Sequence, residues 1–574
     1  MIFLFWVKGL WDILTKTAQV PTLTKRYHYT IFGDYLMKSL ETQYIKAEVR
    51  QRREEGCDIG DISDRVDAAL EAKAGQSEMT ALYDELMSLP VDKSFPYKEP
   101  STLDAIRAER YEGERKLEVP YGDDVLYDRI YGAWLGRAAG CALGKPVEGW
   151  KKEQIDKFLT ETDSLPLDNY LPFREKWISK TQKASTLGNI EFMDRDDDMD
   201  YPILGLLALE RHGAGLTSRG MAYIWLQNMP FGTVYTAEDS AYRNFVMNIF
   251  PPNSAMYRNP FREWIGAQIR ADIFGYAAPG WPEKAAELAF YDAAISHDKN
   301  GIYGEMFVAA MVSAAFVHHG AEEIIAAGLA EIPAESRLAE AVRDTLDWCK
   351  EEDDWLVVWE KINESLGHYH GVHTINNAAL VVMGVWYGVE DFEAGIVKTV
   401  RGGWDTDCTG ATVGSILGAR LGAASLPDKW VGVFNDRLKS VVSGHSDNKI
   451  SDLARRTLDV SKIVMSPVRE KEKVKLGANI GGVWELNSKW GKQVLDFGQG
   501  TIDFINQSWR GVDDKPMDLW SSEYTNPHMS FSYGVDKGGW DYCIDFSGTV
   551  DGDHFEGFYY PGVIPVSGTR KVNT

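Results

Sequence analysis

Two aspartates that are separated by one residue carry the clearest chemical signal in the chain. Asp405 and Asp407 follow two glycines and precede a run of small residues at 411–419. A carboxylate pair with this spacing can direct two oxygen ligands at one hard cation. The small residues behind the pair predict a buried helix that packs closely against a neighbour. The segment therefore favours a metal-dependent hydrolase.

A second acidic cluster lies far upstream. Residues 194–200 hold five aspartates in seven positions and run directly into the apolar segment 203–210. These charges repel one another, so a positive group must offset them if the cluster is buried. Arg195 is one local candidate and a divalent cation is another. A solvated acidic loop is the alternative, but two such clusters beside apolar helices favour a shared metal site.

The composition limits the classes of function. Hydrophobic residues make up 44% and charged residues 25% of the 574 positions, as in soluble globular proteins. A net charge of -24 argues against nonspecific binding to nucleic acid or to an anionic membrane. The apolar run 1–7 is too short to span a membrane. The five scattered cysteines show no CxxC spacing, which predicts neither a disulfide framework nor a zinc knuckle and favours a cytoplasmic location.

Changes in composition and in the spacing of apolar residues along the chain predict four segments. Residues 1–120 are expected to form a helical N-terminal extension, 121–466 an all-α domain, 467–475 a charged linker and 476–574 an all-β domain. Small residues at helical spacing mark a close-packed helix that Pro146 ends. Helical segments recur after it, among them 282–295, 374–387 and one long helix over 336–366, and strand-like alternation is almost absent there.

The last hundred residues alternate apolar and polar residues in short runs. Asp551-Gly552 separates two such runs, and Asp-Gly between alternating strands is the strongest short signal for a hairpin. A small sandwich or meander barrel is expected. Its aromatic residues are expected to form a core rather than a ligand platform.

Four motifs in a fixed order resemble those of a known family. They are Gly-x-Ala-x-Gly-x-Pro-x-Glu ending a small-residue helix at Glu148, the Asp-Asp cluster, a Ser-His pair at 296–297, and Gly-x-Asp-x-Asp at 403–407. Over roughly 125–440, the chain resembles the ADP-ribosylglycohydrolase superfamily. The resemblance implies a compact all-α orthogonal helical bundle with a two-magnesium centre.

The resemblance also implies roles for the motif residues. The expected metal ligands are Asp196, Asp197, Asp198, Asp405, Asp407 and Thr409. Such oxygen ligands suit two Mg²⁺ ions, or Mn²⁺, which can orient a ribose diol and activate water. Glu148 and Asp197 are the candidate catalytic carboxylates, although a loop glutamate is ordinarily a solvated one.

Several polar and aromatic residues are candidates for binding substrate. They are His297, Asn300, Gly301, His373, Asn376 and Trp404. His297 could instead cap a helix end, and Asn376 could cap the helix that follows it. His368, His370 and His373 have a spacing that also suits zinc, but their loop leads into an apolar helix where the resemblance places substrate-binding residues.

Four residues depart from the family pattern, since Asp196 and Met199 replace the two threonines that are usual in the first acidic motif, and Cys408 and Trp404 differ in the second. Cys408 stands where a threonine ligand is usual, and a thiol is a poor ligand for magnesium. Thr409 or water would then take that place, or one metal site is weakened. Trp404 replaces a common glycine and could narrow the pocket or stack on a sugar or base.

The leading hypothesis is a metal-dependent glycohydrolase that cleaves an N- or O-glycosidic bond of a ribose-like sugar. ADP-ribose conjugates are the substrates that the resemblance implies, and the transition state should be oxocarbenium-like. One alternative is a glycoside hydrolase for a small glycoside or oligosaccharide without ADP-ribose, with the β-domain helping to select it. A second alternative is a sugar-binding or structural protein without catalysis.

Overall fold

The structure is a computed structural model in which two compact units are described. One contains the residues up to Pro96 and Met256–Arg262, and the other contains Tyr97–Ala255 and the chain from Glu263 onward. The described residues are 39–466, 483–488, 491–496, 501–505, 517–525, 528–536, 541–551, 554–560 and 564–570. The predicted linker 467–475 and the first 38 residues of the predicted extension lie outside them.

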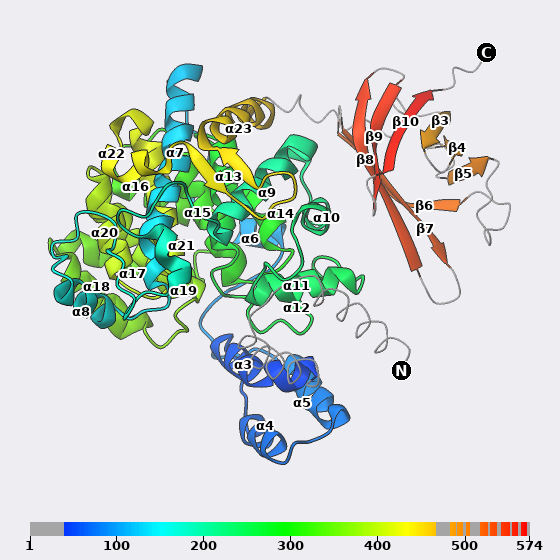
Figure 1. The fold of residues 1–574 in the computed structure, drawn as a ribbon. Helices are drawn as coiled ribbons and strands as arrows, with labels where there is room; N and C mark the ends of the chain where they lie inside the picture. The colour runs from blue at the N-terminus through cyan, green and yellow to red at the C-terminus, as the bar shows by residue number, and fades with distance from the viewer. Residues whose placement is uncertain are drawn as a thin grey trace, which may run out of the picture. The chain divides into compact units, whose positions relative to one another are not determined.

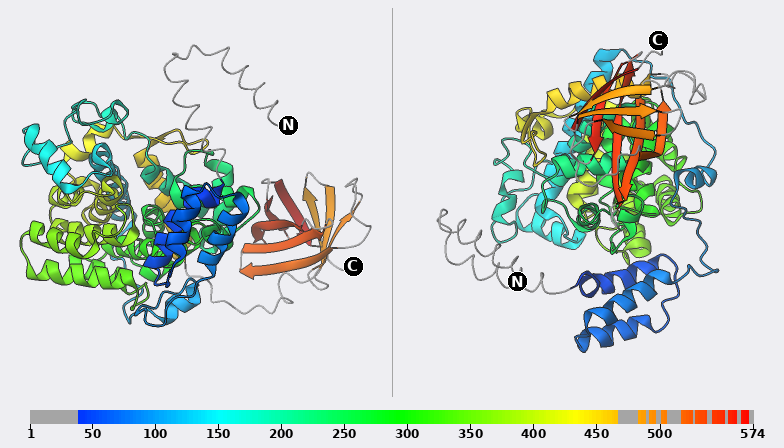
Figure 2. Two further views of the ribbon diagram at one scale, coloured as in Figure 1. Left: turned by 90° about the horizontal axis from the view of Figure 1, so that it is seen from below. Right: turned by 90° about the vertical axis from the view of Figure 1, so that its right-hand side faces the viewer.

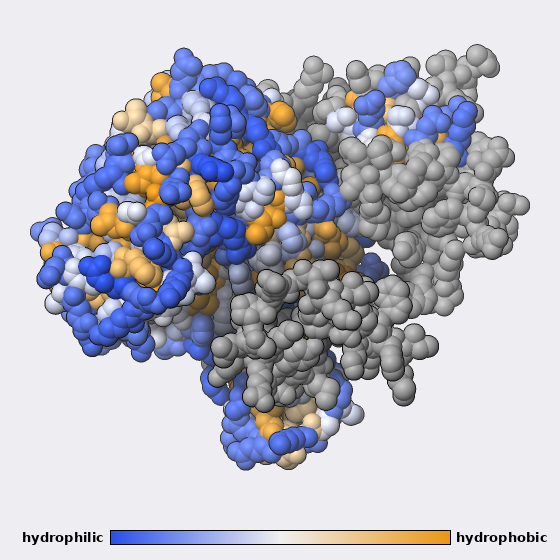
Figure 3. All heavy atoms as spheres, in the orientation of Figure 1, coloured by the Kyte–Doolittle hydropathy of each residue, from blue (hydrophilic) through white to orange (hydrophobic). Residues whose placement is uncertain are grey.

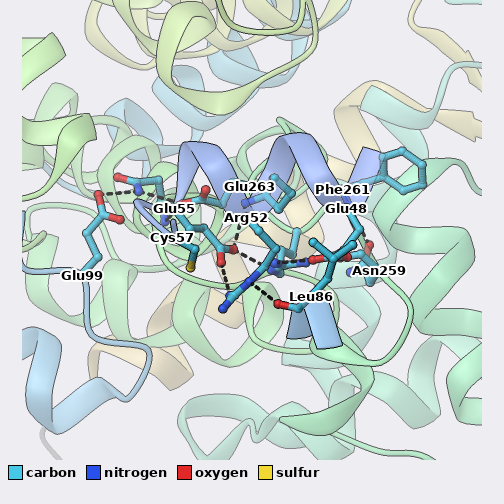
Figure 4. Close-up of polar contacts among 12 residues, drawn as sticks. Glu48, Arg52, Glu55, Cys57, Leu86, Glu99, Asn259, Phe261 and Glu263 are labelled. Atoms are coloured by element: carbon cyan, nitrogen blue, oxygen red, sulfur yellow. Dashed lines mark hydrogen bonds and ion pairs between the residues drawn. The ribbon is translucent and has the colours of Figure 1, made fainter. Parts of the chain in front are cut away.

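Three helices form the first unit, α3 (Leu40–Glu54), α4 (Ile62–Glu71) and α5 (Gln76–Ser88). Their apolar faces share a core to which Tyr83 and Leu86 contribute. Arg262 is fully buried in this unit and forms ion pairs with Glu48 (2.8 Å) and Glu55 (2.7 Å). Figure 4 labels these two glutamates. Breaking a buried pair leaves an uncompensated charge, so Met256–Arg262 is an integral part of the unit.

Helices make up most of the second unit (Figure 1). They are α6 (Leu103–Ala108), α7 (Asp123–Gly144), α8 (Lys152–Glu161), α9 (Asp197–His212), α10 (Ser218–Asn228), α11 (Thr236–Val246), α12 (Asn253–Met256), α13 (Asp272–Ala277), α14 (Pro282–Ala293), α15 (Asn300–Ala315), α16 (Ala321–Leu329), α17 (Arg337–Glu351), α18 (Trp355–Leu366), α19 (Thr374–Gly388), α20 (Phe392–Arg401), α21 (Thr406–Leu421), α22 (Asp428–Val431) and α23 (Ile450–Met465). Every residue of α15 is buried, which makes it a central helix of the core.

A short ribbon of β1 (Arg437–Lys439) and β2 (Asp447–Lys449) interrupts the helices. On the face drawn in Figure 3, hydrophilic residues predominate and apolar areas are small, as the high net charge suggests. Among the described residues, no helix combines the length and the apolar character that crossing a membrane requires. The expected helix over 336–366 is wrong in one respect, because it is divided into α17 and α18.

Glycines bring α7 and α21 into backbone contact. A Cβ atom on Gly140 would lie 1.8 Å from the carbonyl oxygen of Gly410, and one on Gly136 would lie 2.1 Å from that of Gly414. Gly144 meets Thr406 in the same way, at 2.1 Å. Only residues without a Cβ allow such an approach. The predicted close-packed helix is confirmed, and the C-terminus of α7 lies beside the N-terminus of α21.

Eight antiparallel strands at the C-terminal end close into a barrel, seen from two further sides in Figure 2. They are β3 (Val483–Ser488), β4 (Gly491–Asp496), β5 (Thr501–Ile505), β6 (Met517–Thr525), β7 (His528–Asp536), β8 (Asp541–Asp551), β9 (His554–Tyr560) and β10 (Ile564–Arg570). Each strand pairs with the next along the chain, and β10 pairs with β3. Of the two folds expected for this region, a sandwich or a meander barrel, the meander barrel is therefore confirmed.

The predicted hairpin is present, but its turn is one residue further on. Asp551 pairs with His554, so Asp551 belongs to β8, and the connecting residues 552–553 lie outside the described part of the chain. The rings of Trp484, Phe546 and Phe555 are buried against one another. These aromatic side chains form a core, as expected.

Candidate metal centre

The two acidic clusters meet at the N-termini of two helices. Asp196 is the N-cap of α9, and its side chain accepts a hydrogen bond from the amide of Asp198 (3.1 Å). Asp405 occupies the corresponding position before α21. Helix N-termini carry a partial positive charge that stabilises nearby carboxylates. Carboxylates from two segments that are far apart in the sequence therefore lie close together.

Three groups of potential ligand atoms overlap at this place. Within each group the atoms lie within 4.8 Å of one another, and the groups are Cys141–Asp196–Asp198, Asp198–Asp407–Cys408 and Glu148–Asp405–Asp407. Because Asp198 is shared by the first two groups and Asp407 by the last two, they form one continuous cluster. The structure brings together five of the predicted carboxylates and adds two thiols. Asp197 is half-buried beside them and belongs to none of the three groups.

Helix α7 supplies residues that the sequence reasoning missed. Arg137, Cys141 and Lys145 recur at four-residue intervals, which places them on one face of the helix. Arg137 is fully buried and binds Asp198 at 3.0 Å and Asp272 at 2.6 Å. Three ionisable residues at this spacing in a run of glycine and alanine are the signal that could have revealed them.

Basic residues offset part of the acidic charge. Lys145 Nζ lies 3.3 Å from a carboxylate oxygen of Asp196 and 3.6 Å from one of Asp194. Arg195, the predicted local counter-charge, pairs with Asp200 at 2.8 Å. The other oxygen of Asp200 accepts a hydrogen bond from the amide of Val441 (3.0 Å). Both carboxylate oxygens of Asp200 therefore have partners within the protein.

Two buried carboxylate oxygens in the cluster have no hydrogen-bond partner. They are Oδ2 of Asp198 and Oδ1 of Asp407, in residues that are 1% and 4% exposed. Burial, together with the charges of neighbouring carboxylates, raises the pKa of both groups well above the usual range. An unpaired buried oxygen is costly. A cation between the two would satisfy both oxygens and reverse the shift.

Glu148 lies in the loop after α7 and faces Asp405 and Asp407. Although the residue is exposed, loss of water around its carboxylate and the charges of Asp405 and Asp196 raise the pKa of Glu148 to about 7. Backbone hydrogen bonds at 2.9 Å join Gly149 and Trp150 to Trp404 and hold the loop in place.

Trp404 has a left-handed backbone conformation, with φ of +66°. This region is unfavourable for a bulky residue and is often found at functional sites. Its side chain packs against an apolar cluster that includes Trp359 and Leu380. The Oγ1 of Thr409 donates to the backbone oxygen of Asp405 (2.8 Å), so this hydroxyl is engaged within α21. Substrate contact by Trp404 and metal binding by Thr409 stay predictions.

The expected substrate residues of α15 and the loop before it are buried. His297 bonds to Ser296 (2.8 Å), and burial together with Arg270 lowers the pKa of His297 well below its usual value. The ring is therefore neutral at pH 7. Asn300 donates to Glu263 and Glu99, both at 2.8 Å, and Gly301 follows it in the buried first turn of α15. Their contact with substrate stays a prediction.

The histidine loop is tied to the centre by an asparagine. Asn377 donates to the carbonyl oxygens of Gly371 and His373, both at 2.8 Å, and accepts a hydrogen bond from the amide of Asp405 (3.3 Å). Asn376 donates to the carbonyl oxygen of His370 (3.2 Å). His373 caps α19 through its Nδ1. In the described part of the chain, His368, His370 and His373 form no group that could hold a metal, which argues against the zinc alternative.

Comparison with known proteins identifies a family and a similar solved structure. A sequence model of the family described as ADP-ribosylglycohydrolase matches residues 122–463. Among solved structures, the chain is similar to a protein described as an ADP-ribosylglycohydrolase-related protein complex. That match has 18% sequence identity and a TM-score of 0.40, and it covers 60% of this chain and 100% of the other. No curated protein matches the chain.

Proposed function

Because the chain belongs to the ADP-ribosylglycohydrolase family, we propose that it is a metal-dependent glycohydrolase. The bond that it cleaves is the N- or O-glycosidic bond of a ribose-like sugar, and the substrates are ADP-ribose conjugates. One observation carries the proposal beyond family membership. Carboxylates from the N-termini of α9 and α21 converge, and two of their buried oxygens have no partner in the protein.

The donor set fits a hard divalent cation. Four aspartates would hold it, namely Asp196, Asp198, Asp405 and Asp407, and carboxylate oxygens suit Mg²⁺ or Mn²⁺. Asp197 and Thr409 remain further candidates. When bound, such ions orient sugar hydroxyls and lower the pKa of water. Arg137 and Lys145 keep two of these carboxylates in place through their ion pairs.

Glu148 is the candidate general base. A carboxylate accepts a proton from water more readily when its pKa is raised, and loss of water around the carboxylate of Glu148 is the largest cause that raises its pKa. Its carboxylate shares one group of ligand atoms with Asp405 and Asp407, and this closeness to the candidate metal ligands supports the role. As the bond to the leaving group breaks, positive charge develops on the sugar, and the surrounding carboxylates stabilise that charge.

The test compares hydrolysis of an ADP-ribosylated substrate by the full chain with Mg²⁺, with Mn²⁺ and with a chelator. Activity should require the cation, and Asp405→Asn and Asp407→Asn should each lower kcat/KM at least about a hundredfold. Asp459→Asn, on an exposed position of α23, is the matched control and should keep full activity. Activity that survives the chelator, or full activity in either variant, would refute the proposal.

A second candidate function is the hydrolysis of a glycoside without ADP-ribose. The observation in its favour is Trp404, a bulky residue that lies directly before Asp405 in a strained backbone conformation and is only partly buried. Cleavage of a simple riboside or oligosaccharide, with no cleavage of ADP-ribose conjugates, would select it. Cation binding without cleavage of any glycoside would instead indicate a sugar-binding protein.

A further inference from the structure

Two buried thiols lie among the carboxylates of the candidate metal centre. Cys408 Sγ lies within 4.8 Å of ligand oxygens of Asp198 and Asp407, and Cys141 has the same relation to Asp196 and Asp198. Cys408 lies in the first turn of α21 and is 7% exposed. A cation that binds Asp198 therefore has a sulfur within reach from each of two helices.

The other described buried cysteines have different surroundings. Cys57 packs in the apolar core of the first unit, and Cys349 packs in an apolar cluster with residues of α18 and α19. Neither belongs to a group of ligand atoms in the described part of the chain. A buried cysteine usually behaves as a small apolar residue, which accounts for these two. It does not account for a thiol surrounded by carboxylates.

Unpaired oxygens point to a ligand beside Cys408. Asp198 Oδ2 and Asp407 Oδ1 are buried without a hydrogen-bond partner, and both residues share one ligand group with Cys408. A cation held by Asp198 and Asp407 would therefore lie near Cys408 Sγ, whose ligand group contains both residues. The hydroxyl of Thr409 donates its hydrogen to the backbone oxygen of Asp405 (2.8 Å), and its remaining lone pairs make Thr409 the competing ligand that a test must distinguish from Cys408.

We propose that Cys408 supplies a thiolate ligand to a cation held by Asp198 and Asp407. The centre would then prefer a borderline ion, such as Co²⁺ or Zn²⁺, over Mg²⁺, because sulfur ligands select such ions. The inference rests on the proposed function only in requiring that a cation occupies this centre.

The binding step involves no change of oxidation state. The S–H bond of Cys408 breaks, its proton leaves to solvent, and the sulfur forms a bond to the ion in place of one coordinated water. The thiolate adds a negative charge to a centre that already holds five carboxylates against Arg137 and Lys145. Only the charge of the ion offsets this addition, so proton release accompanies binding.

Titration of the full chain with Co²⁺ and with Mg²⁺ tests the proposal, with binding measured by equilibrium dialysis and cobalt–sulfur bonding by the near-ultraviolet charge-transfer band. The wild-type protein should show the band and bind Co²⁺ more tightly than Mg²⁺. Cys408→Ser should lose the band and bind Co²⁺ about tenfold more weakly. Cys349→Ala, which removes a buried thiol outside the centre, should keep both properties. Cys408→Thr is a second variant in case Cys408→Ser fails to fold, and it should shift the preference toward Mg²⁺.

The outcomes separate this inference from the proposed function. If Mg²⁺ binds and supports hydrolysis while Co²⁺ binds without the band, the thiolate ligand is refuted and the glycohydrolase stands. If the band persists in Cys408→Ser and disappears in Cys141→Ser, the assignment to Cys408 is wrong. If neither ion binds the wild-type protein, both proposals fail.

Discussion

Buried carboxylates occur in both compact units, and the protein treats the two sets differently. In the first unit, Arg262 pairs with Glu48 and Glu55. Tyr83 donates to the second oxygen of Glu48 at 2.7 Å, and Arg52 donates to that of Glu55 at 2.6 Å. Each of these carboxylate oxygens has a donor from the protein.

In the candidate metal centre the acidic residues outnumber their basic partners. Arg137 satisfies one oxygen of Asp198, and the other oxygen has no partner, as is also true of one oxygen of Asp407. A fully paired set of buried charges indicates a structural role, because the protein itself supplies the compensation. An incompletely paired set that is shared by two helix N-termini indicates a place where a ligand supplies the rest.

The largest expected effect is a loss of stability when the fully paired carboxylates of the first unit lose their counter-charge. Arg262→Met leaves Glu48 and Glu55 buried without their counter-charge, and removing one partner of a buried pair costs about 3–5 kcal/mol. Urea unfolding of the full chain, with limited proteolysis to detect opening of the first unit, measures it. Arg50→Met is the control, because the side chain of Arg50 is 42% exposed where it pairs with Glu54 on the same helix, with an expected cost below about 1 kcal/mol. An equal loss of unfolding free energy in the two variants would show that the buried ion pairs of Arg262 stabilise the protein no more than the exposed pair does.

The next largest effect is expected where the contact between α7 and α21 positions the carboxylates of the candidate metal centre. Gly140→Ala forces a Cβ against the backbone of Gly410 and should cost about 1–3 kcal/mol by overpacking. It should also weaken cation binding, since the packing of α7 on α21 sets the position of Cys141 and Lys145, which lie beside Asp196, relative to Asp407. Gly122→Ala, at the start of α7 with open space around the new Cβ, is the control for both measurements. Unchanged stability and cation affinity in Gly140→Ala would contradict this account of the helix contact.

In a third buried cluster, around Arg270, burial raises the pKa of carboxyl groups and so favours their protonated, uncharged form. Arg270 faces Glu238 at 2.8 Å, Asp292 at 2.5 Å and Glu305 at 3.5 Å, so one guanidinium serves three carboxylates. Burial raises the pKa of Glu238 to about 7 and that of Glu305 well above the usual range.

Because the pKa of Glu238 is higher in the folded state than in the unfolded state, protonation stabilises the fold. This contribution is fully present below about pH 4.5 and is lost as the pH rises through about 7. Between pH 6 and pH 8, the free energy of unfolding should fall by about 1 kcal/mol from this group. Glu238→Gln should flatten that dependence in urea unfolding at the two pH values, and an unchanged slope would contradict the assignment.

The sequence predicted those features that local patterns determine. The small residues at 411–419 predicted a close-packed helix, and Asp-Gly between alternating runs predicted the β8–β9 hairpin. The division of 336–366 was missed because helical periodicity continues across it. Asp354 begins α18 by accepting a hydrogen bond from the amide of Leu356 (3.0 Å), and this cap ends the continuous helix.

The acidic part of the centre was predictable, but its surroundings were not. The spacing of Asp405 and Asp407, and the density of aspartates at 194–200, are sufficient to predict metal ligands. The roles of Arg137, Cys141 and Asn377 depend on which helices meet, and that is decided by glycine contacts between segments far apart in sequence. The closure of the barrel through β10 and β3 is non-local in the same sense.

If the unpaired carboxylate oxygens of Asp198 in α9 and Asp407 in α21 bind a cation, thermal unfolding with and without a divalent cation should reveal it. A ligand that binds only the folded state stabilises it by about 2.7 kcal/mol at a hundred times its Kd. The wild-type protein should gain Tm as Mg²⁺, Mn²⁺ or Co²⁺ is added. Asp407→Asn should show no gain and, without the cation, be at least as stable as the wild type, since the variant lacks an unpaired buried charge. An equal gain in Asp407→Asn, or a large loss of stability without any cation, would contradict the account.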